Sequence, residues 1–174
     1  MISFKEKYRR ILHIDLETYS SNDIKYGAYK YADADDFEIM LVGYAYDDDP
    51  VKVIDVASGQ KIPDEFIHDI RDPTVLKVAH NATFERVCFS RIILGKGKYL
   101  DAHGWFCTMV MASMLGLPKS LKDVGNALGL PEEDKKKAVI GTKLISFFAV
   151  PQEPKRTNNY RKRNLPVNDE DKWK

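Results

Sequence analysis

Two carboxylates stand two residues apart near the start of the chain. Asp15 and Glu17 lie at the end of the short apolar run of residues 11–16 (ILHIDL), which predicts a buried strand. Side chains at i and i+2 on a strand point to the same face, so the two carboxylates should project together. They would repel each other and lose hydration there, and a divalent cation relieves both penalties. The same pattern also occurs where a strand simply ends at the protein surface.

A second polar cluster follows at residues 79–86 (AHNATFER), where a strand pattern passes into a helical one. Asn81 is positioned either to cap that helix or to hydrogen-bond a substrate. Phe84 has the spacing of a core residue. Glu85 falls in the first helical turn, where it either favours the helix dipole or adds a third acidic ligand. The residues alone leave both alternatives open.

The elements that must position these residues can be predicted from hydrophobic periodicity. Residues 37–46 and 51–56 read as two strands joined by the turn signal at residues 47–50, which predicts a hairpin. Residues 20–36 are interpreted as a long loop. Further segments are predicted as a strand over residues 75–79 and helices over residues 62–72, 83–94, 106–115, 120–128 and 142–148. A hairpin followed by strand-to-helix units indicates an α/β fold with a mixed central sheet.

Composition narrows the class of protein. The 174 residues suit one domain of ordinary size, and the formal net charge is +1. Two cysteines make neither a disulfide framework nor a zinc pattern. No apolar run reaches the length of about 18 residues that a membrane helix needs, so no membrane partner is expected. We predict a domain over residues 1–151 and a basic polar tail over 152–174, the end of which reads as the start of an unfinished helix.

Taken together, the two clusters resemble the first two motifs of the DnaQ-like (ribonuclease H-like) 3′→5′ exonucleases. IDLET matches the first motif and HNATFE the second, in order and spacing. The segments IDLETYSS, VAHNATFER, WFCTM, GLPKSL and GTKLISFF also resemble phage-encoded family A DNA polymerases, from about residue 11 to residue 151. Most of the superfamily has Asp where this chain has Glu85, whose longer arm still offers an oxygen ligand.

The resemblance implies a ribonuclease H-like mixed sheet, with three antiparallel strands plus parallel strands, flanked by helices. It implies two-metal hydrolysis, with Mg²⁺ or Mn²⁺, at the 3′ end of single-stranded DNA. The catalytic and metal-binding residues would be Asp15, Glu17 and Glu85. The substrate-binding residues would be Thr18, Tyr19, Asn81 and Phe84. Further candidates for gripping the strand are Tyr26, Tyr29, Tyr31 and Arg161 to Arg163.

One expected motif is missing from the sequence. The superfamily has a third motif, Tyr-x-x-x-Asp or His-x-x-x-x-Asp, and neither pattern follows Glu85; Tyr160 is followed four residues on by Asn164. We therefore expect a chain cut before a final helix that begins near Asn168, with impaired activity. The resemblance also implies a polymerase domain in the parent chain and a cytoplasmic phage or prophage protein in a bacterial host. The alternatives are a noncatalytic DNA-binding domain and an exoribonuclease of the same fold.

Overall fold

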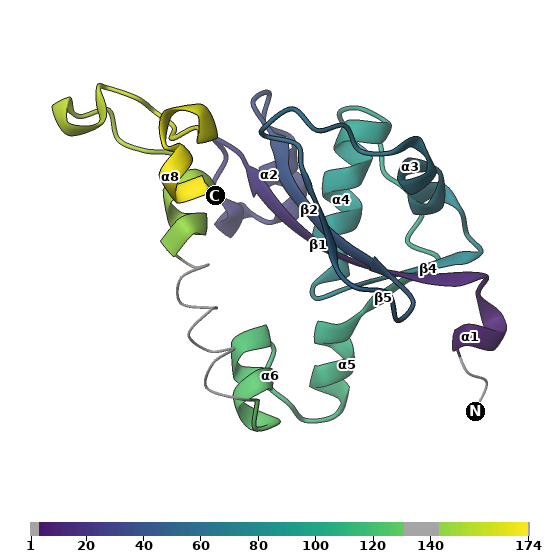
Figure 1. Cartoon of the computed structure of the whole chain (residues 1–174). Coiled ribbons are helices and arrows are strands. Elements are labelled where there is room, and N and C mark those ends of the chain that lie inside the picture. Colours follow the sequence, from purple (N-terminus) through teal and green to yellow (C-terminus); the bar gives the residue numbers. More distant parts are fainter. Residues whose placement is uncertain (1–3, 131–142, 174) are drawn as a thin grey trace.

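The computed structural model describes residues 4–130 and 143–173, and at its centre lies a five-stranded sheet of order β3-β2-β1-β4-β5 (Figure 1). The central strand β1 (Arg10–Tyr19) pairs antiparallel with β2 (Glu38–Tyr46) on one side. On its other side it pairs parallel with β4 (Val75–Ala79). The hairpin and the parallel strand-to-helix unit predicted from the sequence are therefore confirmed.

The two outer strands complete the mixed sheet. β3 (Lys52–Asp55) runs antiparallel to β2, and β5 (Trp105–Cys107) runs parallel to β4. This order and these directions confirm the predicted ribonuclease H-like sheet. The prediction of a helix over residues 106–115 was wrong at its start, since α5 (Thr108–Met114) begins only after β5. Periodicity does not distinguish a short apolar strand from a helical turn, and pairing with β4 decided between them.

Helices flank the sheet (Figure 1). Their bounds are α1 (Phe4–Lys7), η1 (Ile24–Tyr26), α2 (Ala28–Ala32), α3 (Asp64–Arg71), α4 (Ala82–Ile93), α6 (Leu121–Ala127), residues 143–148, η2 (Arg156–Asn158), η3 (Pro166–Asn168) and α8 (Glu170–Trp173). Among the described residues, none of these helices has the length and apolar character to span a membrane.

The main core lies on one face of the sheet. Leu12, Ile14 and Leu16 of β1 are buried there against residues of α2, α3 and α4, whereas the intervening His13 and Asp15 are exposed. This alternation is the period of two expected of a strand with one buried face. It leaves the acidic side chains of β1 on the opposite face, away from the main core.

The segment between β1 and β2 differs from its prediction as a loop. Asp23 caps η1 by accepting a hydrogen bond from the Lys25 backbone, and α2 follows Gly27, whose φ is 90°. Tyr31 of α2 is buried, and its hydroxyl lies 3.1 Å from Thr18 Oγ1. The polar composition of this segment concealed helices that fold because their apolar residues pack under β1.

The predicted basic polar tail contacts the sheet through Arg163 and through Trp173 near its end. The Arg163 guanidinium lies 3.9 Å from the centre of the Tyr19 ring and also pairs with Glu38. The Trp173 indole nitrogen donates a hydrogen bond of 2.7 Å to Asp55. The helix expected near Asn168 is present as η3 and α8. The domain boundary at residue 151 stays a prediction.

The alternation on β1 gives a direct test of the fold. We expect Leu12→Ala to lower the free energy of unfolding by about 2–5 kcal/mol, because Leu12 is fully buried and its loss leaves a cavity. His13→Ala on the same strand should change it by less than about 0.5 kcal/mol, because His13 is exposed. Urea denaturation of the two variants checks this, and equal losses would contradict the assignment of faces.

Candidate active site

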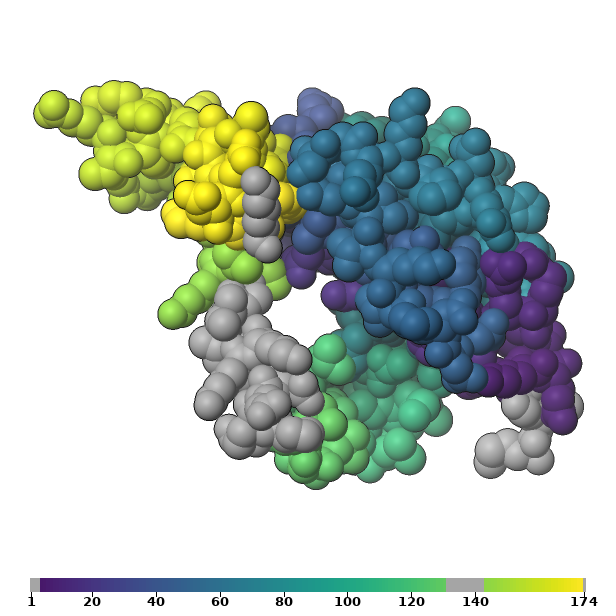
Figure 2. Space-filling view, viewed as in Figure 1, coloured from purple at the N-terminus to yellow at the C-terminus, as the bar shows by residue number. Residues whose placement is uncertain are grey.

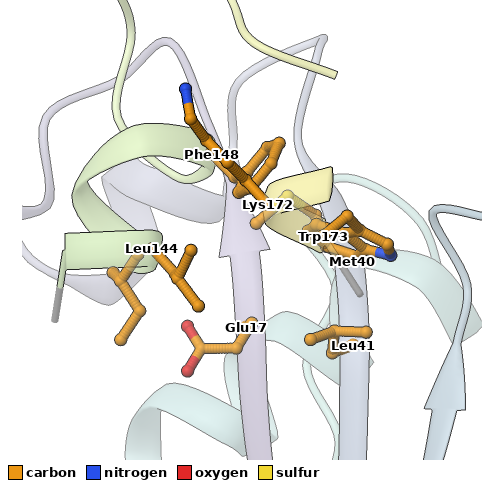
Figure 3. A pocket seen from close by; sticks show the side chains of 8 residues that line it. Glu17, Met40, Leu41, Leu144, Phe148, Lys172 and Trp173 are labelled. Atoms are coloured by element: carbon orange, nitrogen blue, oxygen red, sulfur yellow. The ribbon is translucent and has the colours of Figure 1, made fainter. Parts of the chain in front are cut away.

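The first two carboxylates lie on the free face of β1. Asp15 is exposed and Glu17 is half-buried, while Leu16 between them points into the core. The Glu17 carboxylate points toward Leu144 of the helical segment 143–148 (Figure 3). The register of β1 against β2 shifts between Glu17 and Thr18, because Met40 of β2 is an extra residue at that point.

The third carboxylate comes from α4. Glu85 is only 3% exposed, and its Oε2 has no hydrogen-bond partner among the described residues. Burial raises the pKa of Glu85 to about 8, and the charge of Asp15 adds to this rise. The fold thus brings Glu85, in the first turn of α4, within electrostatic range of Asp15 on β1.

The other two acids are also shifted toward their protonated forms. Burial raises the pKa of Asp15, with smaller lowering effects from the Leu16 backbone and His80. Burial together with the charge of Asp15 raises the pKa of Glu17 to about 7. Although Asp15 is open to solvent, protein atoms surround it on its other sides, which accounts for the desolvation.

No lysine or arginine in residues 4–130 and 143–173 forms an ion pair with any of the three acids. The nearby Lys172 amine points away from Glu17 (Figure 3) and lies 3.9 Å from the centre of the Phe147 ring. Carboxylate oxygens are the ligands that Mg²⁺ and Mn²⁺ prefer, so the chemistry of these three acids suits such an ion. Among the described residues, however, the acidic group whose ligand atoms lie within 4.8 Å of one another is a different one, and metal binding by Asp15, Glu17 and Glu85 stays a prediction.

A second acidic group has a different character. His68, Asp69 and Asp72 offer ligand atoms within 4.8 Å of one another. However, Arg9 pairs with both carboxylates at 2.7 and 3.2 Å, and Arg10 pairs with Asp69 at 2.9 Å. These charges are already neutralised, so this cluster is a structural ion-pair network joining β1 to α3.

A hollow of about 500 Å³ opens beside Glu17. Two predicted substrate-binding residues, Thr18 and Phe84, line it. Tyr31 supports both, because its hydroxyl meets Thr18 and its ring centre lies 5.8 Å from that of Phe84. The remaining lining residues are Leu16, Ser20, Ser21, Asn22, Asp23, Ile24, Ile145, Ala149, Val150 and Pro151. Several come from residues 145–151, whose part in this wall the sequence did not indicate.

The other two predicted substrate-binding residues are placed differently. The Tyr19 side chain is 4% exposed and packs with Met40 and Phe148, so it does not line the hollow, and its predicted contact with substrate stays a prediction. Tyr19 lies two residues beyond Glu17 on the same face of β1, and Glu17 borders Met40 and Phe148 as well. Asn81 is exposed at the start of α4 with φ 75°, and its side chain makes no capping hydrogen bond. Its predicted contact with substrate stays a prediction.

Glu17 also borders a smaller apolar hollow of about 200 Å³ on its other side. Met40 and Leu41 of β2 form one wall, and Trp173 of α8 lies beside Met40 (Figure 3). Leu144 and Phe148 face them. Sequence reasoning did not find this hollow, because its walls come from segments more than 100 residues apart that no local pattern links.

His80 ties the end of β4 to the α5–α6 region. Its Nε2 lies 2.8 Å from the Lys119 carbonyl oxygen, and its Nδ1 lies 3.1 Å from Thr108 Oγ1. Nε2 must donate to the carbonyl, which leaves Nδ1 to accept from the hydroxyl in the neutral ring. His80 therefore holds α5 next to the Asp15 side of the site.

The aromatic and basic candidates are mostly occupied elsewhere. Tyr29 accepts a hydrogen bond from Arg86, and Tyr31 is buried, while Tyr26 is 68% exposed. Arg161 pairs with Asp169 at 3.4 Å. Neither Tyr31 nor Arg161 is thus open to grip a strand in the way the sequence suggested.

Comparison with known proteins gives one strong relative. The chain is 45% identical over 165 residues to the DNA polymerase of Bacillus phage SP02, which is 94% of this chain and 24% of that polymerase. This match confirms the resemblance to a phage DNA polymerase, of which the chain spans about a quarter. No model of a known protein family matches the sequence.

Solved structures offer weaker likenesses. NrnC of Brucella melitensis is 19% identical with a TM-score of 0.48, over 68% of this chain and 52% of that one. The Nibbler EXO domain of Aedes aegypti is 15% identical with a TM-score of 0.41, over 61% of this chain and 46% of that one.

The raised pKa values predict how stability changes with pH. Metal-free protein should lose stability as pH rises from about 5 to 8, because folded Glu85 and Glu17 keep protons that the unfolded chain releases near pH 4.5. Glu85→Gln should flatten this fall, which reaches on the order of 1 kcal/mol per pH unit for one such group. Thermal unfolding in a chelator at pH 5, 6.5 and 8 measures it. Asp64→Asn, an exposed control on α3, should keep the wild-type slope.

Proposed function

From this relationship to a phage DNA polymerase, we propose that the chain is a metal-dependent 3′→5′ exonuclease domain that removes nucleotides from single-stranded DNA, as in proofreading. One observation carries the proposal. Asp15 lies within electrostatic range of both Glu17 and Glu85, none of the three pairs with a cation among the described residues, and Glu85 Oε2 is buried without a hydrogen-bond partner there. Such carboxylates are unfavourable in a protein unless a cation or a reaction uses them.

The three acids have distinct places around the ions that they would hold. Asp15 is the acid that acts electrostatically on both others, so it would share in holding the metal with each of them. Glu17 borders both hollows, so it suits contact with one ion and the terminal 3′ hydroxyl. Glu85 would act on the second ion from its buried position. Bound Mg²⁺ or Mn²⁺ would supply an activated water and stabilise the leaving 3′ oxygen.

The larger hollow is the proposed seat of the terminal nucleotide. Phe84 offers an aromatic face, and Thr18 is held by Tyr31 at a fixed distance from it. Aromatic faces bind any base by stacking, which suits an enzyme that must accept every terminal nucleotide. Asn81 would reach the strand with its side-chain amide, and Tyr19 would contribute through its backbone alone.

The setting follows from the relative. We infer that in the parent protein the domain works beside a polymerase domain during phage or prophage DNA replication in a bacterial cytoplasm. A noncatalytic DNA-binding domain is the second candidate. It is favoured by one observation, the lack of a Tyr-x-x-x-Asp or His-x-x-x-x-Asp pattern after Glu85.

Metal binding can be tested without turnover. We expect Mn²⁺ to raise the melting temperature of the chain more at pH 8 than at pH 6, because the ion must displace protons from Glu17 and Glu85. Asp15→Asn should remove the rise. Asp72→Asn in the ion-paired cluster should lower the melting temperature but keep the Mn²⁺ response. If the Mn²⁺-induced rise in melting temperature is lost in Asp72→Asn and kept in Asp15→Asn, the metal binds the cluster of His68, Asp69 and Asp72, and the proposed site is contradicted.

Activity is tested with 5′-labelled 20-nucleotide strands of DNA and RNA. We expect a slow ladder of DNA products shortened from the 3′ end, about 10²- to 10⁴-fold below an exonuclease with a water-orienting third motif. Asp15→Asn should abolish it, and Asp64→Asn should not. Degradation that survives Asp15→Asn would contradict the site. Faster cleavage of RNA would favour the exoribonuclease alternative, and DNA binding without any cleavage would favour the noncatalytic one.

A further inference from the structure

Residues 152–163 form a projecting element, which we name the basic arm. It extends from the molecule as the yellow-green lobe in Figures 1 and 2. The arm leaves directly after Pro151, which lines the larger hollow, and returns at Arg163, which lies over the Tyr19 ring. The Gln152 backbone N–H donates to the Lys162 carbonyl at 2.8 Å and closes its base. One end of the arm therefore begins at the rim of the larger hollow, and the other end lies on the second core.

The tip of the arm is internally braced by one side chain. Asn158 accepts a hydrogen bond from the Lys155 backbone N–H at 2.8 Å through its side-chain oxygen. Its side-chain nitrogen donates to the Glu153 and Arg161 carbonyls at 2.8 and 3.2 Å. These contacts use both sides of the amide, so the tip is preorganised for a contact and loses little conformational entropy when it binds.

Backbone strain coincides with an exposed aromatic ring at this tip. Asn159 and Tyr160 have φ values of 52° and 58°, in the left-handed region. Asn tolerates this region, but a bulky aromatic residue rarely adopts it. Tyr160 is nevertheless held there, 68% exposed. Strain that presents a large ring to solvent is typical of a surface used for recognition.

Two cations accompany the ring. Arg156 and Lys162 are exposed, and neither makes an ion pair with any residue in the described parts of the chain. The other basic residues of the arm are engaged. Lys155 pairs with Glu153 at 2.9 Å, as Arg161 does with Asp169 and Arg163 with Glu38. The tip thus offers one stacking surface and two available positive charges.

We propose that the basic arm binds the single strand upstream of its 3′ end, with Tyr160 stacked on a base and Arg156 and Lys162 on phosphates. This rests on the proposed function, because the arm begins where the hollow for the terminal nucleotide ends. Single-strand sites combine cationic tracks with aromatic platforms in this way. The core of a protein-binding surface instead gathers apolar residues and excludes charge, which does not describe this tip.

The test measures binding of the whole 174-residue chain to a fluorescein-labelled 20-nucleotide oligo-dT by anisotropy, in a chelator and over a range of salt. Tyr160→Asn removes the ring while keeping a residue that tolerates the left-handed backbone. Arg156→Gln with Lys162→Gln removes the charges. The matched control is Lys98→Gln with Tyr99→Ala, which removes a cation and an exposed ring beyond the far end of α4.

We expect Tyr160→Asn to weaken binding about five-fold or more. The Arg156→Gln, Lys162→Gln variant should reduce the magnitude of the slope of log K against log salt by about 1.4, because each of the two lost phosphate contacts contributes about 0.7. The Lys98 and Tyr99 control should bind as wild type. If the arm variants bind the oligonucleotide as wild type does, the proposal is overturned, and an arm that binds a protein partner would give this result. An equal loss of binding in the control also overturns it. Since no cleavage is measured, failure of the nuclease assignment and failure of the arm are distinguishable.

Discussion

Desolvation of Asp15, Glu17 and Glu85, increased for the two glutamates by the charge of Asp15, is the constraint that other contacts in the structure must offset. Each acid is partly or wholly removed from water, and Asp15 raises the pKa of the other two. Holding them together is unfavourable, so other contacts must offset it. The offset comes from the opposite face of the same strand, where Leu12, Ile14 and Leu16 are buried in the main core.

The contrast between Asp69 and Glu85 shows how partners decide the behaviour of a buried acid. Both are nearly inaccessible, at 1% and 3% exposure. Desolvation raises the pKa of each, but hydrogen bonds from Tyr46 and Arg9 outweigh it for Asp69, whose pKa is lowered. Asp69 is therefore a stable anion that joins α3 to β1. Glu85 lacks such side-chain donors: a backbone hydrogen bond lowers its pKa only in part, and its Oε2 has no hydrogen-bond partner among the described residues.

The segments at the C-terminal side of the chain shape the site without supplying an acid. The helical residues 143–148 and α8 pack on the end of β1 and β2, through Phe148 and Trp173, whose ring centres are 4.9 Å apart. They separate the two hollows that border Glu17. The same contacts anchor the base of the basic arm. A change that loosens the packing of this region should therefore also weaken the proposed contact of the arm with a single strand.

The sequence by itself determined what depends on local period. Alternation along β1 places Asp15 and Glu17 opposite Leu16, and the strand-to-helix pattern places Glu85 in the first turn of α4. Only the tertiary structure decided which polar residues lose water and which find partners. Tyr19 is buried in a second core with Met40 and Phe148, and Glu85 Oε2 has no hydrogen-bond partner among the described residues. Burial and pairing depend on segments distant along the chain, whereas periodicity reports only the backbone that carries each side chain.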